Sequence, residues 1–396
     1  MTTQKRGAKT VLASAAVGLL IVAVCGLGLF ALNGGSLATL FDVSAVAGQG
    51  SATETKEVVD SLGRTVSVPA DPQRIAALDA FSGNVCVLAG AGDKLMGAPG
   101  GVLSNELLRE LCPGLESVEQ LSGNSVNVET LLSAGVDVAL VKRDLYDGGE
   151  ETAKLDKLGI PYVVVDYSTV EEQQDAIELV GRVCGPAAAE KAAAVAEYYR
   201  ETAALVEERA ASVPESERKR VYHSINDPLL TDGSGSLGAD WVARCGAVDV
   251  SAGEAGVGGT GDYTATLEQV YAWNPDVIVC STADARSAIL GDAQWQGMAA
   301  VAAGEVRNLP VSTSRWGQRG DPETFLGMLW LGKTLYPQLY EDVDLEETVR
   351  SYYRDVVGLD IDDATWEAIV AGEGLRAEGS GGQEGQGSGS GSGGGR

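Results

Sequence analysis

Histidine and basic side chains are scarce in this sequence. His223 is the one histidine in 396 residues, and 29 lysine and arginine residues stand against 56 aspartate and glutamate residues, a formal net charge of -27. This negative charge argues against nucleic acid as a partner, because a phosphate backbone needs a basic surface. The lack of histidine disfavours zinc or manganese binding through several histidine ligands.

Motifs for catalysis and for metal binding are also missing. The six cysteines follow no C-x-x-C spacing, there is no G-x-S-x-G motif, and a Ser-His-Asp triad would have to use His223. The stretch "GSGSLG" (233–238) matches a dinucleotide fingerprint formally, but seven residues separate it from the preceding strand, so we reject that function. We therefore expect no enzyme, no catalytic residue, no cofactor and no metal ligand.

One long apolar run lies near the N-terminus. Residues 11–32 carry no charge, are long enough to span a bilayer and follow three basic residues, so the rest of the chain is expected outside the cytoplasm. We predict a membrane anchor or signal segment over 1–32, and a signal peptide cut after Ala47 is the alternative. Outside the cell disulfides are permitted. Cys86 with Cys112 and Cys245 with Cys280 are possible pairs, and buried free thiols are the alternative.

Composition and hydrophobic periodicity divide the chain into segments. Strand and helix patterns alternate in two halves, which predicts an α/β fold with two similar lobes and one long connecting helix of about 26 residues. We expect a further, buried helix in "PETFLGMLWLGKTLYPQL". The expected segments are a linker (33–56), an N-terminal lobe (57–170), a bridging helical segment (171–216), a C-terminal lobe (217–374) and a disordered Gly/Ser-rich tail (375–396).

A helix–strand unit is written twice. "VNVETLLSAGVDVALV" (126–141) and "TATLEQVYAWNPDVIV" (264–279) each carry a capping residue two before a glutamate and an Asp-Val pair eight after it. Such a repeat indicates two lobes of similar architecture. In each copy the cap places the glutamate, Glu129 or Glu268, in the first helical turn, where the helix dipole favours a carboxylate.

The stretch "VVDSLGRTVSVPADPQRIAAL" (58–78) resembles the opening of substrate-binding proteins of ABC importers for iron–siderophores, haem and cobalamin. "LGADWVARCGAVDVS", both glutamate motifs and "PETFLGMLWLGKTLYP" resemble the same family, so that the resemblance covers about residues 56–372. It implies an opening edge hairpin and two Rossmann-like lobes bridged by a single long helix, with a ligand cleft between the lobes. It also implies that Glu129 and Glu268 dock onto arginines of the importer permease.

Ligands of α/β lobes bind at the carboxyl ends of strands, and basic residues cluster there in this otherwise acidic chain. This favours an anionic ligand, such as a ferric siderophore or haem with its propionates. Trp316 is a candidate for stacking on a planar group. His223 could ligate the iron of a bound haem, but a plain strand-end residue is the preferred interpretation unless haem binds. The candidate ligand-binding residues are Phe81, Ser82, Lys142, Arg143, Tyr146, His223, Ser224, Asn226, Arg315, Trp316 and Arg319.

The sequence predicts an extracytoplasmic, membrane-anchored or secreted protein that delivers a ferric siderophore or a related metal chelate, haem or cobalamin, to an ABC importer permease. We expect a monomer. Two alternatives remain open. The same fold could bind an oxyanion such as molybdate or tungstate, with Ser82, Ser224 and Ser234 as donors, or the chain could be a surface-anchored sensing module without transport.

Overall fold

The computed structural model describes residues 54–256 and 261–375, which all lie in one structural unit. The expected N-terminal membrane segment, nearly all of the expected linker and nearly all of the expected tail fall outside these residues. Within the described part, no helix combines the length and the apolar composition that crossing a membrane requires.

An antiparallel hairpin opens the described chain. It pairs β1 (Thr55–Val59) with β2 (Thr65–Pro69). Asp60 stabilises the turn between them, because its carboxylate accepts hydrogen bonds from the backbone N–H groups of Leu62 and Arg64. The hairpin agrees with the opening that the resemblance implies.

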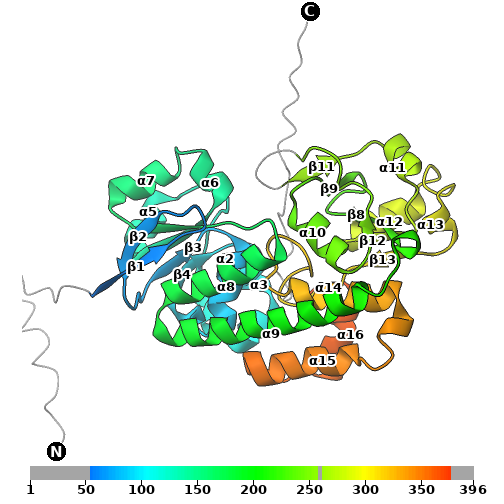
Figure 1. Ribbon diagram of the computed structural model, residues 1–396. Helices are drawn as coiled ribbons and strands as arrows, with labels where there is room; N and C mark the ends of the chain where they lie inside the picture. The colour runs from blue at the N-terminus through cyan, green and yellow to red at the C-terminus, as the bar shows by residue number, and fades with distance from the viewer. Residues whose placement is uncertain (1–53, 257–260, 376–396) are drawn as a thin grey trace, which may run out of the picture. The chain divides into compact units, whose positions relative to one another are not determined.

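Each lobe is built on a parallel sheet (Figure 1). The first lobe has the strand order β5-β4-β3-β6-β7, and the second has β10-β8-β12-β13. The order β4-β3-β6-β7 in the first lobe corresponds to β10-β8-β12-β13 in the second. This confirms the two similar α/β lobes. The bounds of these strands are β3 Ile75–Ala77, β4 Leu95–Ala98, β5 Glu119–Gln120, β6 Val138–Lys142, β7 Tyr162–Val165, β8 Arg220–Ser224, β10 Val248–Asp249, β12 Val277–Cys280 and β13 Val306–Asn308.

The aspartate of each repeated Asp-Val pair holds the start of the neighbouring central strand. In the first lobe, Asp137 accepts a hydrogen bond of 2.9 Å from the backbone N–H of Arg74 and pairs with its guanidinium at 3.2 Å. In the second lobe, Asp276 accepts one of 2.8 Å from the backbone N–H of Arg220. The guanidinium of Arg220 donates in turn to the carbonyl of Trp273, at the end of the preceding helix. The repeat is thus a structural unit that fixes strand register.

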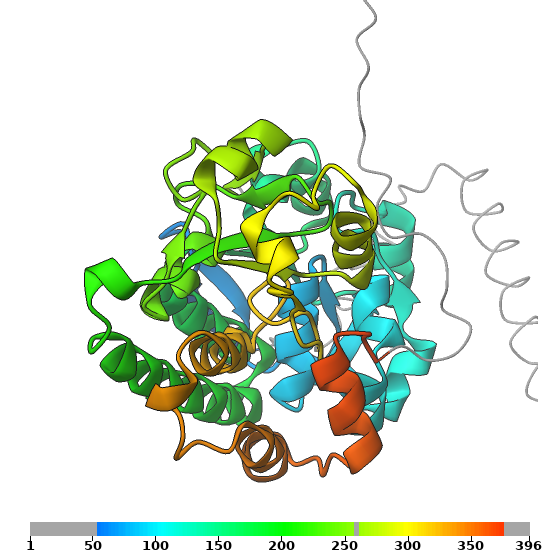
Figure 2. The same ribbon diagram turned by 90° about the vertical axis from the view of Figure 1, so that its right-hand side faces the viewer.

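Helices surround the sheets and join the lobes. The long connecting helix α9 (Pro186–Ala210) has 25 residues, close to the predicted 26, and spans about 37 Å. It packs against α8 (Val170–Cys184) and α14 (Thr324–Leu335), the latter being the predicted buried helix. Figures 1 and 2 show α9 in green alongside both lobes, with the orange C-terminal helices beside it. The other helices named with an α are α2 Ala80–Leu88, α3 Gly100–Ser104, α4 Glu106–Leu111, α5 Val128–Ala134, α6 Arg143–Asp147, α7 Thr152–Leu158, α10 Leu237–Arg244, α11 Leu267–Trp273, α12 Ala283–Gly291, α13 Ala299–Ala302, α15 Leu345–Ser351 and α16 Asp363–Ala371.

The two faces of each sheet belong to different hydrophobic cores. Alternate strand residues, such as Val138 and Val279, join the large core that includes α9 and α14. The intervening residues, such as Ala139 and Ile278, join a smaller core confined to one lobe. This alternation follows from the period of two along a strand. The helices of the repeat, α5 and α11, pack against these smaller cores.

The segment between β13 and α14, residues 311–323, lies between the lobes and is called the cleft loop below. Two fully buried carboxylates hold it. Asp321 accepts hydrogen bonds from the backbone N–H groups of Gly317 and Glu323, at 2.8 and 3.0 Å. Glu323 accepts from the hydroxyl groups of Ser312 at 2.6 Å and Thr313 at 2.7 Å. Burial and the neighbouring Glu323 raise the pKa of Asp321, so the loop depends on these donors to keep both carboxyl groups satisfied.

Side chains of the first lobe bind the backbone of the cleft loop. The amide of Asn84 donates to the carbonyl of Gly320 at 2.8 Å, and that of Asn105 donates to the carbonyl of Ser312 at 2.7 Å. Gln173 on α8 donates to the carbonyl of Asp321 at 2.8 Å. The cleft loop follows β13 of the second lobe, and these contacts also hold it to the first lobe and to α8.

The cysteines do not form the pairs suggested by their sequence positions. The Cys86 sulfur lies 3.4 Å from that of Cys184, because α2 packs against α8, whereas Cys112 donates to Asp93. Cys245 donates to the carbonyl of Met328. All five cysteines in the described residues are buried free thiols, the alternative that the sequence left open.

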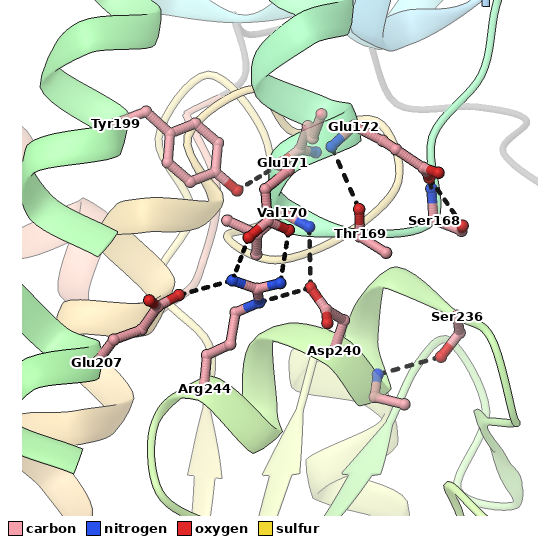
Figure 3. A network of polar contacts seen from close by, with 12 residues as sticks. Ser168, Thr169, Val170, Glu171, Glu172, Tyr199, Glu207, Ser236, Asp240 and Arg244 are labelled. Carbon is pink, nitrogen blue, oxygen red and sulfur yellow. Dashed lines mark hydrogen bonds and ion pairs between the residues drawn. The ribbon is translucent and has the colours of Figure 1, made fainter. Parts of the chain in front are cut away.

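Arg244 joins the second lobe to the connecting helices (Figure 3). From α10, its guanidinium pairs with Glu171 at 2.5 Å, Glu207 at 2.6 Å and Asp240 at 2.8 Å. Asp240 also accepts from the backbone N–H of Val170, at the start of α8. One cation thus connects three helices.

We predict that Arg244→Gln lowers the free energy of unfolding by about 2 kcal/mol, because three carboxylates lose their cation in a partly buried site. Burial alone would raise the pKa of Glu171, but the hydrogen bond and charge of Arg244 lower it. This stabilisation is therefore lost as pH falls through the folded pKa of Glu171, and the variant and wild type should converge in acid. Urea unfolding measures the difference, with the exposed Arg354→Gln as control; equal effects of both variants would contradict the prediction.

We also predict that Gly317→Ala destabilises the protein by about 2–4 kcal/mol, through backbone strain and overpacking. Gly317 has a φ of 78°, and an added Cβ would lie 2.7 Å from the buried ring of Trp241. Gly304 is the matched control, since its φ is 74° and no atom lies within 4 Å of an added Cβ. Gly304→Ala should cost only about 1 kcal/mol in the same urea titration. Equal losses would show that Trp241 does not constrain the loop.

Candidate functional site

A cavity of about 340 Å³ lies between the lobes, where the first lobe faces the cleft loop. The first lobe contributes the N-terminal part of α2, α3 and Asn105. The second contributes residues after β8, the start of β11 (Asp262–Thr264) and the cleft loop. The polar residues in its wall, apart from Asp262, are Asn84, Asn105, Asn226, Thr313, Ser314, Arg315, Gln318 and Arg319.

Both cavity arginines belong to the cleft loop. Arg315 donates to the side-chain oxygen of Asn226 at 3.0 Å. Arg319 pairs with Asp166 of the first lobe at 3.3 Å, and its carbonyl accepts a hydrogen bond from the hydroxyl of Tyr167. Among the described lining residues, these two arginines carry positive charge and Asp262 carries negative charge, so the wall has a net positive charge.

Unpaired polar atoms lie at the start of α2, next to the cavity wall. Asp79 caps this helix by accepting from the backbone N–H of Ser82 at 2.8 Å. Within the described residues, its second oxygen, the Ser82 hydroxyl and the Asn84 side-chain oxygen are buried without a hydrogen-bond partner. Burial raises the pKa of Asp79. A buried polar atom without a partner costs about 1–3 kcal/mol, so these three atoms lower the stability of the start of α2.

His223 lies behind the cavity wall in a buried polar chain. Its Nδ1 is 2.6 Å from a carboxylate oxygen of Asp232, on β9 (Leu230–Asp232), and its Nε2 is 2.9 Å from the hydroxyl of Ser281. Gln318 separates this chain from the cavity, since its amide lies 3.0 Å from Nε2 and 2.7 Å from the Ser281 hydroxyl. The order of groups is that of a hydrolase triad, but Ser281 is only 2% exposed and Gln318 lies against its hydroxyl.

Three of the eleven candidate ligand residues line this cavity: Asn226, Arg315 and Arg319. Phe81, Ser82, Ser224 and His223 are buried outside its lining. Trp316 is fully buried, with its indole N–H bonded to the Ser312 hydroxyl, so in this structure it offers no face for stacking.

The basic pair after β6 also lies away from the cavity. Helix α6 begins at Arg143, which pairs with Asp147 at 3.2 Å and Asp166 at 3.3 Å. Lys142 donates to the side chain of Asn124 at 2.9 Å. Tyr146 packs under the guanidinium of Arg64 at 4.5 Å. Their ligand roles stay predictions, without contact to this cavity.

The sequence interpretation missed the neutral amides of the wall. Asn84 and Asn105 come from helical stretches of the first lobe, and Gln318 from the loop after the last strand of the second. No charge or spacing sets them apart in the sequence. A capping pattern marks only Asn105, which accepts from the backbone N–H of Leu108. Within the described residues, no group of three or more His, Cys, Asp and Glu side chains is arranged to hold a metal ion.

The repeated helices place their glutamates alike. Asn127 caps α5 and Thr266 caps α11, each by accepting from a backbone N–H three residues on. Glu129 and Glu268 are both exposed in the first turn, as the capping pattern predicts.

Known proteins resemble the chain in sequence and in fold. The family model described as periplasmic binding protein matches residues 75–313. The molybdate-binding protein MolA of Haemophilus influenzae is 29% identical over 336 residues, 77% of this chain and 91% of that protein. Its molybdate-bound structure superimposes with a TM-score of 0.69 at 26% identity, covering 78% of this chain and 99% of MolA.

Two further structures share the fold. A periplasmic solute-binding protein of Veillonella parvula has a TM-score of 0.67 at 24% identity, over 80% of this chain and 97% of its own. Helicobacter pylori CeuE with Ni(II) bound has a TM-score of 0.66 at 19% identity, over 80% and 99%. These matches agree with the resemblance found in the sequence. The two parallel-sheet lobes, the cavity between them and the family match together show that the chain belongs to the periplasmic binding protein family.

Proposed function

We propose that this substrate-binding protein of an ABC importer captures a small oxyanion of the molybdate or tungstate type and delivers it to a permease. The composition of the cavity wall carries the proposal: two guanidinium groups and several neutral amide and hydroxyl groups, against the single carboxylate of Asp262 among the described lining residues, surround about 340 Å³. Arginine recognises anions through charge-assisted hydrogen bonds, and amides and hydroxyls add uncharged donors. The relative MolA, whose printed name is molybdate-binding protein, supports the same ligand class.

A ferric siderophore, haem or cobalamin, predicted from the sequence, is the second candidate. The cavity arginines favour it as well, because such chelates carry carboxylates or other acidic groups. Two observations weigh against it. Pockets for drug-sized ligands run from about 300 to 1,000 Å³, so this cavity is at the small end. Among its described lining residues none is aromatic or histidine, so neither a planar ring nor iron meets a matching side chain.

The proposal includes docking through Glu129 and Glu268. Both are exposed at the positive end of a helix, and among the described residues no ion pair satisfies either of them. The third residue after each glutamate is a large exposed apolar side chain, Leu132 with 57% and Tyr271 with 38% of its surface accessible. Residues three apart share a helix face, so each lobe offers a carboxylate beside an apolar group. Such matched faces suit a partner with two similar basic sites.

We predict that the isolated protein binds molybdate and that Arg315→Gln weakens binding about tenfold or more, because one charge-assisted hydrogen bond is lost. Isothermal titration calorimetry measures both. Arg307→Gln is the matched control, an exposed arginine of the second lobe outside the cavity, and should bind like the wild type. If the protein binds an iron chelate and does not bind molybdate, the oxyanion proposal is wrong and the second candidate is supported.

We predict that the double variant Glu129→Ala/Glu268→Ala abolishes uptake while its affinity for the ligand stays unchanged, because the docking anions lie outside the cavity. Uptake is measured in cells that carry the variant as their sole copy. The control Glu106→Ala/Asp284→Ala also removes one exposed first-turn acid from each lobe, from α4 and α12, and should transport normally. Normal uptake by the first double variant would refute the docking role.

A further inference from the structure

The contact between Gln318 and His223 links the ligand cavity to a buried titratable network. Gln318 is half-buried in the cavity wall, and the NH₂ group of its amide lies 3.0 Å from Nε2 of His223 and donates to the Ser281 hydroxyl at 2.7 Å. On the far side of the imidazole, Asp232 lies 2.6 Å from Nδ1. His223 is 1% and Asp232 3% exposed, so both depend on these protein partners for their hydrogen bonds.

The protonation state of the imidazole decides which end of the Gln318 amide can form a hydrogen bond with Nε2. Asp232 fixes a proton on Nδ1 in either state. When His223 is neutral, Nε2 has a lone pair and accepts a hydrogen bond from the Gln318 NH₂ group, which is the orientation of the amide in this structure. When His223 is protonated, Nε2–H is a donor and needs the Gln318 carbonyl oxygen instead. The Ser281 hydroxyl fits both states, since it can donate or accept.

We propose that His223 is a positioning residue that sets, through its proton, which atom of the Gln318 amide faces the ligand. With His223 protonated, the carbonyl of Gln318 turns inward and its NH₂ group faces the cavity beside Arg315 and Arg319. With His223 neutral, the carbonyl faces the cavity and repels an anion. The inference rests on the proposed oxyanion function and adds a residue that determines whether Gln318 presents a donor or an acceptor to the cavity.

The charged groups around His223 favour the protonated form. Burial by itself lowers the pKa of an imidazole, but the carboxylates of Asp232, Asp249 and Asp262 outweigh it, so the pKa of His223 lies above its usual value. Burial and Asp232 raise the pKa of Asp249 to about 7, and its ionisation then helps to keep His223 protonated. From α10 the neighbour is the uncharged ring of Trp241, which meets the imidazole edge-on. Arg315 and Arg319 of the cleft loop are the cations of the neighbouring cavity wall.

Linkage fixes the direction of the pH dependence. Anion affinity is highest below the folded pKa of His223 and falls as pH rises through it, because the cavity then loses a donor and gains an acceptor. By the same linkage, anion binding at a pH near that pKa draws a proton onto the protein. A role of His223 in packing alone would give neither effect.

The test is a set of calorimetric titrations of the whole protein with molybdate from about pH 6 to about pH 9, in buffers of different ionisation enthalpy. The expected result is a wild-type affinity that falls at least about tenfold over this range, with proton uptake on binding. Asp232→Asn should shift the fall to lower pH, since His223 loses its nearest anion. Gln318→Met, in a half-buried position that tolerates change, should bind weakly with a flat pH profile, whereas the exposed Gln338→Met should behave like the wild type.

Two results would overturn the inference, and they are distinguishable. Tight molybdate binding with the same pH profile in the wild type and Gln318→Met would refute the role of Gln318 and His223 but leave the oxyanion function intact. Absence of molybdate binding at every pH would refute the oxyanion function, and this inference with it.

Discussion

Two buried carboxylates, Asp321 and Glu323, hold the segment on which the binding cavity depends. They collect donors from the backbone of Gly317 and from the hydroxyls of Ser312 and Thr313, and so fold the cleft loop back on itself. Burying these two carboxyl groups without their donors would be costly, so the fold of the cleft loop and the burial of Asp321 and Glu323 depend on each other. Both cavity arginines and Gln318 are carried on this loop, so the chemistry of the site follows from the way the acids are satisfied.

The lobes share a core, and this sets what can move. One face of each sheet packs into the hydrophobic core around α9 and α14, and Arg244 adds ionic contacts between α8, α9 and α10. Continuous packing of this kind permits small adjustments of the lobes more readily than a wide hinge opening. The outer faces carry α5 and α11, whose exposed glutamates are thereby kept at fixed positions relative to the cavity. Ligand capture and partner recognition can therefore use different faces of one rigid frame.

Much of the fold could be predicted from the sequence, because its signals are local or repeated. The caps Asn127 and Thr266, the Asp-Val pairs and the alanine-rich stretch of α9 each act within a few residues, and the helices that they predict are present. The site was less accessible to such reasoning. Asn84, Asn105 and Gln318 are neutral, lie far apart in the chain and meet only because the cleft loop returns to the first lobe. Arg143 and Trp316 were chosen from strand-end positions, but α6 begins at Arg143 and the buried indole of Trp316 bonds within the loop. The contact of Cys86 with Cys184 likewise depends on helix packing that no spacing encodes.

The proposed oxyanion ligand rests on two guanidiniums and a set of uncharged donors in a wall that also holds the carboxylate of Asp262, and the identity of the bound molecule is the most direct check on it. Elemental analysis and absorbance spectroscopy of the protein, purified from cells grown with molybdate and iron, would reveal what the cavity retains. Stoichiometric molybdenum in a colourless protein is the predicted result. A Soret band or an iron charge-transfer band, with no molybdenum, would contradict it.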